Sequence, residues 1–248
     1  MSSLPEVSVV IPAYNEATYI DRLLEALSKQ QDVNFEVIVS DAQSGDGTKE
    51  VVNTFKDKLD IKFFEAPPQG PAFGRNQGAK HATGEWLLFL DADDDIDDPH
   101  FIKLLLKCTK ENNWNTSSAK MTARGKAAKK YAKLYKYQKL LSHTNRPVAS
   151  GYCLFTNAAN FKENSGFNEK IHFGEDYEYV SRTGKNGKFG FVESTEFFVD
   201  PRRNNEDGLK LTLQGTLNEV YRLFFGYKKL EKNPIKYEFG KHQSRRKK

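Results

Sequence analysis

The chain of 248 residues contains few cysteines and no long apolar run. Its two cysteines, Cys108 and Cys153, lack the paired spacing of a metal site, so we assign them no function. No stretch reaches the roughly 18–20 apolar residues that a membrane-spanning helix needs. The first residues, MSSLPEVSVV, lack the basic and apolar regions of a secretory signal peptide. We therefore expect a cytoplasmic location.

Positive and negative charges are unevenly distributed along the chain. Residues 115–146 contain nine lysines or arginines and no acid, and residues 227–248 contain nine more with two acids. The remaining residues carry 20 basic and 31 acidic side chains. This separation predicts a surface that docks onto an anionic partner, such as phospholipid headgroups or nucleic acid.

Strand and helix patterns alternate through the first half of the chain. The β-branched run over residues 7–11 predicts a buried parallel strand. Further strands are expected over residues 35–39, 61–64 and 86–90, with amphipathic helices between them, including one over 20–27 and one over 101–106. This alternation predicts an α/β fold with a mostly parallel central sheet flanked by helices and a Rossmann-like N-terminal half. No G-x-G-x-x-G follows the first strand, which excludes a dinucleotide-dependent dehydrogenase.

The second half of the chain is less regular. A lysine-rich helix is predicted over residues 126–141, with Tyr131 and Tyr135 on its apolar face. Further expected elements are strands over 152–156, 189–192 and 196–199 and helices over 173–182 and 209–225. We expect one domain over residues 1–226, with a nucleotide-binding half at 1–98, an acceptor-binding half at 99–226, and a flexible basic tail at 227–248.

Three polar loops follow predicted strand ends: PAYNE, SDAQSGDGT and DADDD. Because parallel strands end at one edge of a sheet, these loops should lie together where such sheets bind ligands. The last loop begins a segment with six aspartates, residues 91–98. On an extended backbone Asp91 and Asp93 would lean to the same side and offer oxygen ligands to Mg²⁺ or Mn²⁺. A solvated acidic turn is the alternative.

Four motifs together give the chain a family resemblance. VSVVIPAYNE, VIVSDAQSGDGT, GPAFGRNQGAKHATGEWLLFLDADDD and GFNEKIHFGEDYEYVSRTGKNG occur in the order found in family-2 glycosyltransferases. The resemblance covers about residues 7–192. It implies the GT-A fold and a nucleotide-diphospho-sugar donor.

The resemblance also implies a donor site and a metal site. In it, Asp41 accepts a hydrogen bond from an N–H of uracil or guanine, Arg75 approaches the base or phosphate, and Asp93 binds a divalent cation. The other positions that it places at the donor are Pro12, Ala13, Tyr14, Glu16, Asp91 and Ala92, with Asp91 shared with the metal. Ala42 and Gln43 replace the usual second aspartate and glycine of the Asp41 loop. The base therefore stays open: UDP is favoured, and GDP or dTDP are alternatives.

The motif GEDYEY is where inverting members of the family keep a catalytic base. The resemblance makes Asp176 the base, with Glu175 supporting it, in a single displacement at the sugar C1. A helix N-terminus should keep Asp176 ionised. We expect Glu178 to face solvent. The alternative is that Glu175 and Asp176 only complement the helix dipole.

Absent motifs narrow the function further. The Q-x-x-R-W signature of processive synthases is missing, which favours transfer of one sugar. PAYNE replaces the glycine-rich loop of sugar-1-phosphate nucleotidyltransferases. A non-catalytic module that binds nucleotides or anionic surfaces is the alternative function.

The expected acceptor is a glycan or a polyprenyl-phosphate-linked sugar, and Arg202 and Arg203 could clamp the diphosphate. An anionic membrane at the cytoplasmic face could contact the basic tail and the lysines of the 126–141 helix, namely Lys126, Lys129, Lys130 and Lys133. Nucleic acid is the less favoured partner.

Overall fold

The computed structural model describes residues 4–185 and 188–201, with the single residues 217, 221, 226 and 231. Arg202, Arg203 and almost all of the expected 209–225 helix and of the basic tail lie outside the described residues. In the described part, no helix is long and apolar enough to cross a bilayer.

A central sheet organises the described residues, with its strands in the order β3-β2-β1-β4-β6-β5-β7. The strands are β1 (Val7–Ala13), β2 (Phe35–Asp41), β3 (Ile61–Glu65), β4 (Trp86–Leu90), β5 (Thr116–Thr122), β6 (Cys153–Asn157) and β7 (Phe189–Phe198). β3, β2, β1 and β4 run parallel to one another, β6 is antiparallel to both β4 and β5, and β7 is parallel to β5. The expected mostly parallel sheet is confirmed.

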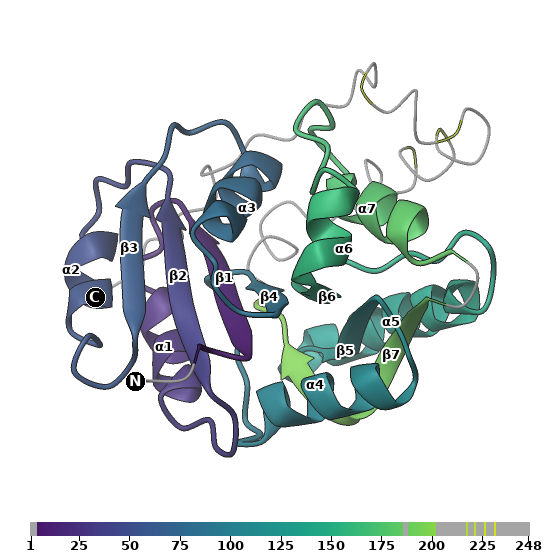
Figure 1. The fold of residues 1–248 in the computed structure, drawn as a ribbon, viewed down its shortest axis with the longest axis horizontal. Helices are drawn as coiled ribbons and strands as arrows, with labels where there is room; N and C mark the ends of the chain where they lie inside the picture. Colours follow the sequence, from purple (N-terminus) through teal and green to yellow (C-terminus); the bar gives the residue numbers. More distant parts are fainter. Residues whose placement is uncertain are drawn as a thin grey trace.

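Helices flank both halves of this sheet (Figure 1). They are α1 (Ile20–Leu27), α2 (Thr48–Asn53), α3 (Pro71–Lys80), α4 (Phe101–Glu111), α5 (Ala128–Ser142), α6 (Ala158–Glu163) and α7 (Glu175–Thr183), with a short 3-10 turn at Gly125–Ala127. α3 lies against β1 and β2, and α4 and α5 lie against β5 and β7. β5 and α6 were not expected, and the two short strands expected near residues 189–199 form the single strand β7 with an irregular register against β5.

The hydrophobic pattern of the sequence does not predict β5, because the buried side chains of this strand are largely polar. Thr116, Ser117 and Ser118 are almost fully buried. Ser117 Oγ lies 2.7 Å from Thr109 Oγ1, and Thr116 Oγ1 lies 3.0 Å from Thr156 Oγ1. A buried hydroxyl with a hydrogen-bond partner carries little penalty, so a polar strand is stable inside the sheet.

Close contact between α3 and β1 brings the middle of α3 to the sheet edge where β1 and β2 end. Gly78 makes this contact possible, because a Cβ there would lie 2.3 Å from Cγ1 of Val10. Gly74, one turn earlier, would place its Cβ 3.2 Å from Cβ of Pro12. The glycines therefore fix how near Arg75, also on α3, lies to the strand ends.

We expect Gly78→Ala to destabilise the fold although alanine favours helix. Overpacking a core costs about 1–3 kcal/mol, which exceeds the roughly 1 kcal/mol of helix propensity gained. Val10→Ala alone should cost roughly 2 kcal/mol through lost burial. In the double variant the new methyl group occupies part of the space that Val10 leaves, so the combined cost should fall below the sum. Urea unfolding of the four proteins measures this, and additive costs would contradict the contact.

One edge of the sheet collects the polar loops. β1, β2 and β4 end there, and β6 begins there because Cys153 pairs with Leu90. β5 and β7 end at the same edge, since Phe198 of β7 bridges to Asp95 in the acidic segment. We call this the catalytic edge. α5 starts near it, directly after β5.

Candidate functional site

The loops after β1 and β2 are joined by hydrogen bonds. Asn15, at φ 56°, donates its backbone N–H to Ser44 Oγ at 2.7 Å and accepts from the Gly45 N–H at 2.9 Å. Glu16 donates its N–H to Thr48 Oγ1 at 2.9 Å. Pro12 and Ala13 are the last residues of β1, and the Tyr14 side chain beyond them is 38% exposed. The expected nucleotide cradle is thus a fixed loop pair with an accessible aromatic ring.

Asp41 ends β2 and is 2% exposed. Its two carboxylate oxygens accept hydrogen bonds from Ser44, from the backbone N–H at 2.8 Å and from the hydroxyl at 2.6 Å. An ionised carboxylate has about four acceptor positions, so two remain for a ligand N–H.

The acidic segment does not continue as extended backbone, so the expected side-by-side alternation of Asp91 and Asp93 is wrong. Residues 91–94 form a tight turn in which the Asp94 N–H donates to the Asp91 carbonyl at 3.0 Å. Asp94 Oδ2 in turn accepts from the Asp91 N–H at 2.9 Å. The short aspartate side chain favours such a local bond over a strand ladder. Ala92, within the turn, is buried.

At least four of the six aspartates contact an arginine or accept a hydrogen bond from a distant or neighbouring residue. Arg75 contacts Asp91, and Arg124 contacts Asp95 at 3.3 Å and Asp97 at 2.7 Å. Asp98 Oδ2 accepts from the Thr195 hydroxyl at 2.8 Å, and its Oδ1 accepts from the His100 N–H at 2.9 Å.

Asp93 and Asp94, at 4% and 0% exposure, form the buried part of the turn. Asp94 Oδ1 has no hydrogen-bond partner. Burial, together with the charges of Asp91 and Asp93, raises the pKa of Asp94 well above its ordinary value. The turn therefore gathers neighbouring carboxyl groups in a buried position, which favours the neutral form of Asp94.

These residues fit a divalent cation. In the part of the chain that the structure describes, no three His, Cys, Asp or Glu side chains form a ready metal cage. A Mg²⁺ or Mn²⁺ ion that shares its coordination with substrate phosphates needs only one or two carboxylates. Asp93 and Asp91 would supply these, and the orphaned oxygen of Asp94 is consistent with a positive charge nearby.

Arg75 joins the acidic turn to α7. The sequence suggested a position near a helix start, but α3 begins at Pro71, so Arg75 lies within the helix and is 3% exposed. Its guanidinium donates to Asp91 Oδ1 at 2.7 Å, to Glu175 Oε1 at 2.9 Å and to the Gly151 carbonyl at 3.1 Å. The donor fork expected to face a base or phosphate is thus largely engaged by the protein.

Asp176 lies in the first turn of α7, beside this arginine. Its Oδ2 accepts from the Gly151 N–H at 2.5 Å and its Oδ1 from the Tyr177 N–H at 2.8 Å. Burial raises the pKa of Asp176 to about 7, with a further increase from the charge of Glu175 and a decrease from Arg75. The helix N-terminus was expected to keep Asp176 ionised, but burial and a neighbouring carboxylate raise its pKa instead.

Glu178 does not face solvent as expected. It is 9% exposed and pairs with Arg182 at 2.7 Å. Arg182 also donates to the carbonyls of Asn164 and Gly166, so the pair fastens α7 to the preceding loop. Because Arg182 lies four residues after Glu178, the sequence contained the signal for this pair.

Two residues near the site received no role from the sequence, although Asn76 was placed with Arg75 near a helix start. Gly151 holds Asp176 and Arg75 through its backbone, and a Cβ there would lie 2.9 Å from Arg75 Nη2. Asn76 exchanges two hydrogen bonds with the Phe167 backbone, both at 2.9 Å, and donates to Glu169 at 2.8 Å. Asn76 thereby positions the loop that leads to α7.

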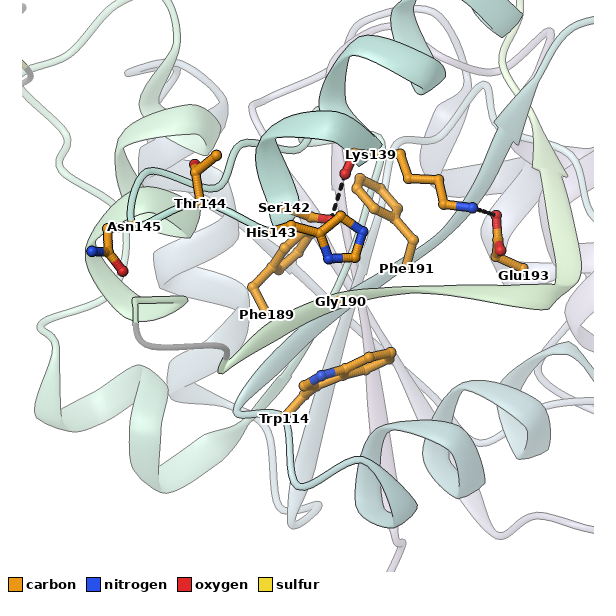
Figure 2. Close-up of a pocket in the computed structure, with 10 residues that line it drawn as sticks. All are labelled: Trp114, Lys139, Ser142, His143, Thr144, Asn145, Phe189, Gly190, Phe191 and Glu193. Atoms are coloured by element: carbon orange, nitrogen blue, oxygen red, sulfur yellow. Dashed lines mark hydrogen bonds and ion pairs between the residues drawn. The ribbon is translucent and has the colours of Figure 1, made fainter.

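A pocket of about 440 Å³ lies away from this site. Figure 2 shows Trp114 on one side and His143, Phe189 and Phe191 on the other. Phe189 and Trp114 lie at the amino ends of β7 and β5, the edge opposite the aspartates. The candidate site is therefore the catalytic edge, where the polar residues meet.

Comparison with known sequences identifies a family. The profile of Glycosyl transferase family 2 matches residues 8–172. A Campylobacter jejuni GalNAc(5)-diNAcBac-PP-undecaprenol beta-1,3-glucosyltransferase is 28% identical over 243 residues, covering 92% of this chain and 74% of that protein. An uncharacterized glycosyltransferase of Rickettsia felis is 29% identical over 231 residues, covering 87% of this chain. The chain spans 38% of the length of that relative.

Solved structures agree with the sequence comparison. Staphylococcus aureus TarS residues 1–349, in complex with UDP, superposes with a TM-score of 0.63 at 25% identity over 81% of this chain and 62% of that one. A Pyrobaculum calidifontis mannosyltransferase in complex with GDP-Man and Mn²⁺ has a TM-score of 0.65 at 20% identity, over 79% and 57% of the two chains, and supports the fold alone. The fold is the expected GT-A type, and the chain belongs to glycosyltransferase family 2.

Proposed function

We propose that this protein is an inverting glycosyltransferase that moves one sugar from a nucleotide-diphospho-sugar to an acceptor hydroxyl or lipid phosphate. The observation that carries the proposal is the buried Arg75, which contacts both Asp91 of the acidic turn and Glu175 beside Asp176. Arg75 therefore links a carboxylate assigned to the sugar donor, Asp91, with the pair assigned to the catalytic base, Glu175 and Asp176, at one edge of the sheet. A protein that only bound anionic surfaces would need neither.

The donor lies, in this proposal, across the ends of β1, β2 and β4. The ring of Tyr14 and the backbone of Pro12, Ala13 and Glu16 border the nucleotide, and Asp41 accepts from the base. We favour UDP as the nucleotide, supported by the TarS structures solved with UDP and UDP-GlcNAc. Asp91 and Ala92 lie at the ribose, and Asp93 with Asp91 holds Mg²⁺ or Mn²⁺.

The reaction is a single displacement at the sugar C1. Asp176 accepts the proton of the acceptor hydroxyl as its oxygen bonds to C1, and the bond from C1 to the diphosphate oxygen breaks. The nucleoside diphosphate leaves with the electron pair, and a divalent cation held by Asp93 and Asp91 would offset its charge. The Gly151 N–H orients Asp176, and Arg75 offsets the negative charge of the carboxylates around it. An acceptor that is already an ionised phosphate would not need this base.

The acceptor is a glycan or a polyprenyl-phosphate-linked sugar of the cell envelope. Support comes from the Campylobacter jejuni relative, whose name specifies an undecaprenol-linked acceptor, and from TarS, a poly(ribitol-phosphate) beta-N-acetylglucosaminyltransferase. A lipid-linked acceptor would place the protein in the cytoplasm at the inner face of the membrane.

Calorimetric titration with UDP, GDP and dTDP, with and without Mn²⁺, tests the donor site. We expect one nucleotide to bind tightly only with Mn²⁺, and Asp93→Ala to abolish the gain from the metal. Asp97→Ala is the matched control, because Asp97 lies on the same segment as Asp93 but is exposed and pairs with Arg124. That variant should bind as the parent does.

Two results would contradict the proposal. Folded protein that binds none of the nucleotides would exclude the donor site. Equal losses of nucleotide affinity in both aspartate variants would mean that Asp93 contributes only its negative charge and does not bind the metal. The non-catalytic alternative predicts nucleotide binding without turnover. Release of free sugar from the matching nucleotide-sugar, a slow side reaction of an active site, separates the two.

A further inference from the structure

α5 presents an outward surface on which lysine and apolar side chains alternate. The buried side of the helix consists of Tyr131, Tyr135, Gln138 and Ser142. The opposite side consists of Lys129, Lys133, Lys136, Tyr137 and Leu140, all exposed, which we call the α5 outer face. Leu140 is 70% exposed and Tyr137 38%. Helical spacing places the two apolar side chains one turn apart, next to the lysines.

Three lysines of this face have no acidic neighbour in the part of the chain that the structure describes. Among the described residues, no carboxylate lies within ion-pair distance of Lys129, Lys133 or Lys136. Nearby basic side chains behave differently: Lys139 pairs with Glu193 at 2.6 Å and Lys120 with Glu196 at 2.7 Å. Glutamates near α5 therefore pair with other lysines, and in the described part of the chain they form no ion pair with the three lysines of the outer face.

α5 is also held firmly against the elements of the candidate site. Gln138, 1% exposed, donates to Ser150 Oγ at 2.6 Å and to the Tyr177 hydroxyl at 2.9 Å. Ser150 precedes Gly151, and Tyr177 follows Asp176. The helix starts near the catalytic edge, so whatever the outer face contacts has a fixed relation to the proposed base.

We propose that the α5 outer face rests on an anionic lipid surface, with Leu140 and Tyr137 entering the headgroup boundary and the three lysines contacting phosphates. This deepens the proposed function, on which it rests, by naming the surface that brings a lipid-linked acceptor to the site. A helix that lies in the membrane plane needs basic and apolar side chains on the same exposed side. Nucleic acid would match the lysines but would leave Leu140 in contact with water, so we favour lipid.

Sedimentation of the full chain with vesicles tests the proposal. The expected binding is strong with a mixture of phosphatidylglycerol and phosphatidylcholine and weak with phosphatidylcholine alone. The K129Q/K133Q/K136Q variant should bind the anionic vesicles roughly 100-fold less, because each basic residue near headgroups contributes about 1 kcal/mol, about fivefold in affinity. Leu140→Ser should weaken binding several-fold without changing the charge.

The matched control is K49Q/K58Q/K103Q, which removes the same charge from exposed lysines that pair with acids elsewhere. We expect it to change vesicle binding by less than about threefold. Equal losses in the two triple variants, or none in the α5 variant, would overturn the proposal. So would single-stranded RNA binding that is lost with the α5 lysines while vesicle binding is kept. UDP titration of each variant tests the donor site separately from lipid binding. Vesicle binding by a chain that binds no nucleotide would contradict the proposed function but not the lipid contact of α5.

Discussion

Asp176→Asn is expected to lower turnover by about 10²–10⁴-fold, the range that a general base contributes. The amide has almost the shape of the carboxylate, and its oxygen can still accept the Gly151 N–H. Nucleotide affinity should therefore stay within about twofold while the proton acceptor is lost. Steady-state kinetics with the donor identified by titration, alongside calorimetry, measures both quantities.

The pH dependence gives an independent check on Asp176. Because its pKa is raised to about 7 and the base must be ionised, kcat/KM of the parent should rise with pH through about 7 and level off above it. The folded state holds this proton to a higher pH than the unfolded chain does. The free energy of unfolding should therefore fall as pH rises from about 4 to 7, a trend that Asp176→Asn removes. Turnover within tenfold of the parent would rule Asp176 out as the base.

Arg75→Gln should have the largest effect on stability, a loss of about 3–5 kcal/mol, because it leaves the buried Glu175 and the partly buried Asp91 without their counterion. Asp91 and Glu175 both lose a short bond, and the Gly151 carbonyl loses its donor. Arg75→Lys keeps the charge but not the fork that reaches both acids, so we expect it to fall between the parent and Arg75→Gln. Chemical denaturation measures all three proteins.

The chain offers a matched control for this effect. Arg124 also contacts two aspartates, Asp95 and Asp97, but its side chain is 55% exposed. Arg124→Gln should cost less than about 1 kcal/mol, as is usual for exposed pairs. If Arg75→Gln costs no more than this control, Arg75 does not act as a buried counterion. If Arg75→Gln fails to fold, Arg75→Lys still tests the ordering.

The parallel half of the fold could be predicted because its central strands β1, β2 and β4 are largely buried on both faces. β4 is a continuous apolar run and β1 is apolar except for Ser8, and buried parallel strands have this pattern. β5 has no such pattern, because its stability depends on hydroxyl partners, Thr109 and Thr156, which come from α4 and β6. Local sequence does not reveal pairs that only the folded chain brings together.

The candidate site divides in the same way. The motifs placed Asp91 in a loop and Asp176 at a helix start, and the structure brings both close to Arg75. The partners of Arg75 could not be predicted, since Glu175 is 100 positions away. Gly151 acts through its backbone, which carries no side-chain signal. The environment of Asp176 was misjudged because helix dipoles can be inferred from sequence, whereas burial by distant elements cannot.

The backbone of Gly151 has a consequence for protein engineering. Its N–H binds Asp176, and the carbonyl of the same residue binds Arg75, which in turn contacts Asp91. Each of the two peptide groups that meet at this residue is planar, so a change in its backbone dihedrals reorients the N–H, the carbonyl or both. Grafting a loop from a relative between α5 and β6 to alter acceptor choice would therefore also shift the donor side. Acceptor and donor preferences should have to be redesigned jointly in this scaffold, with residue 151 kept as glycine.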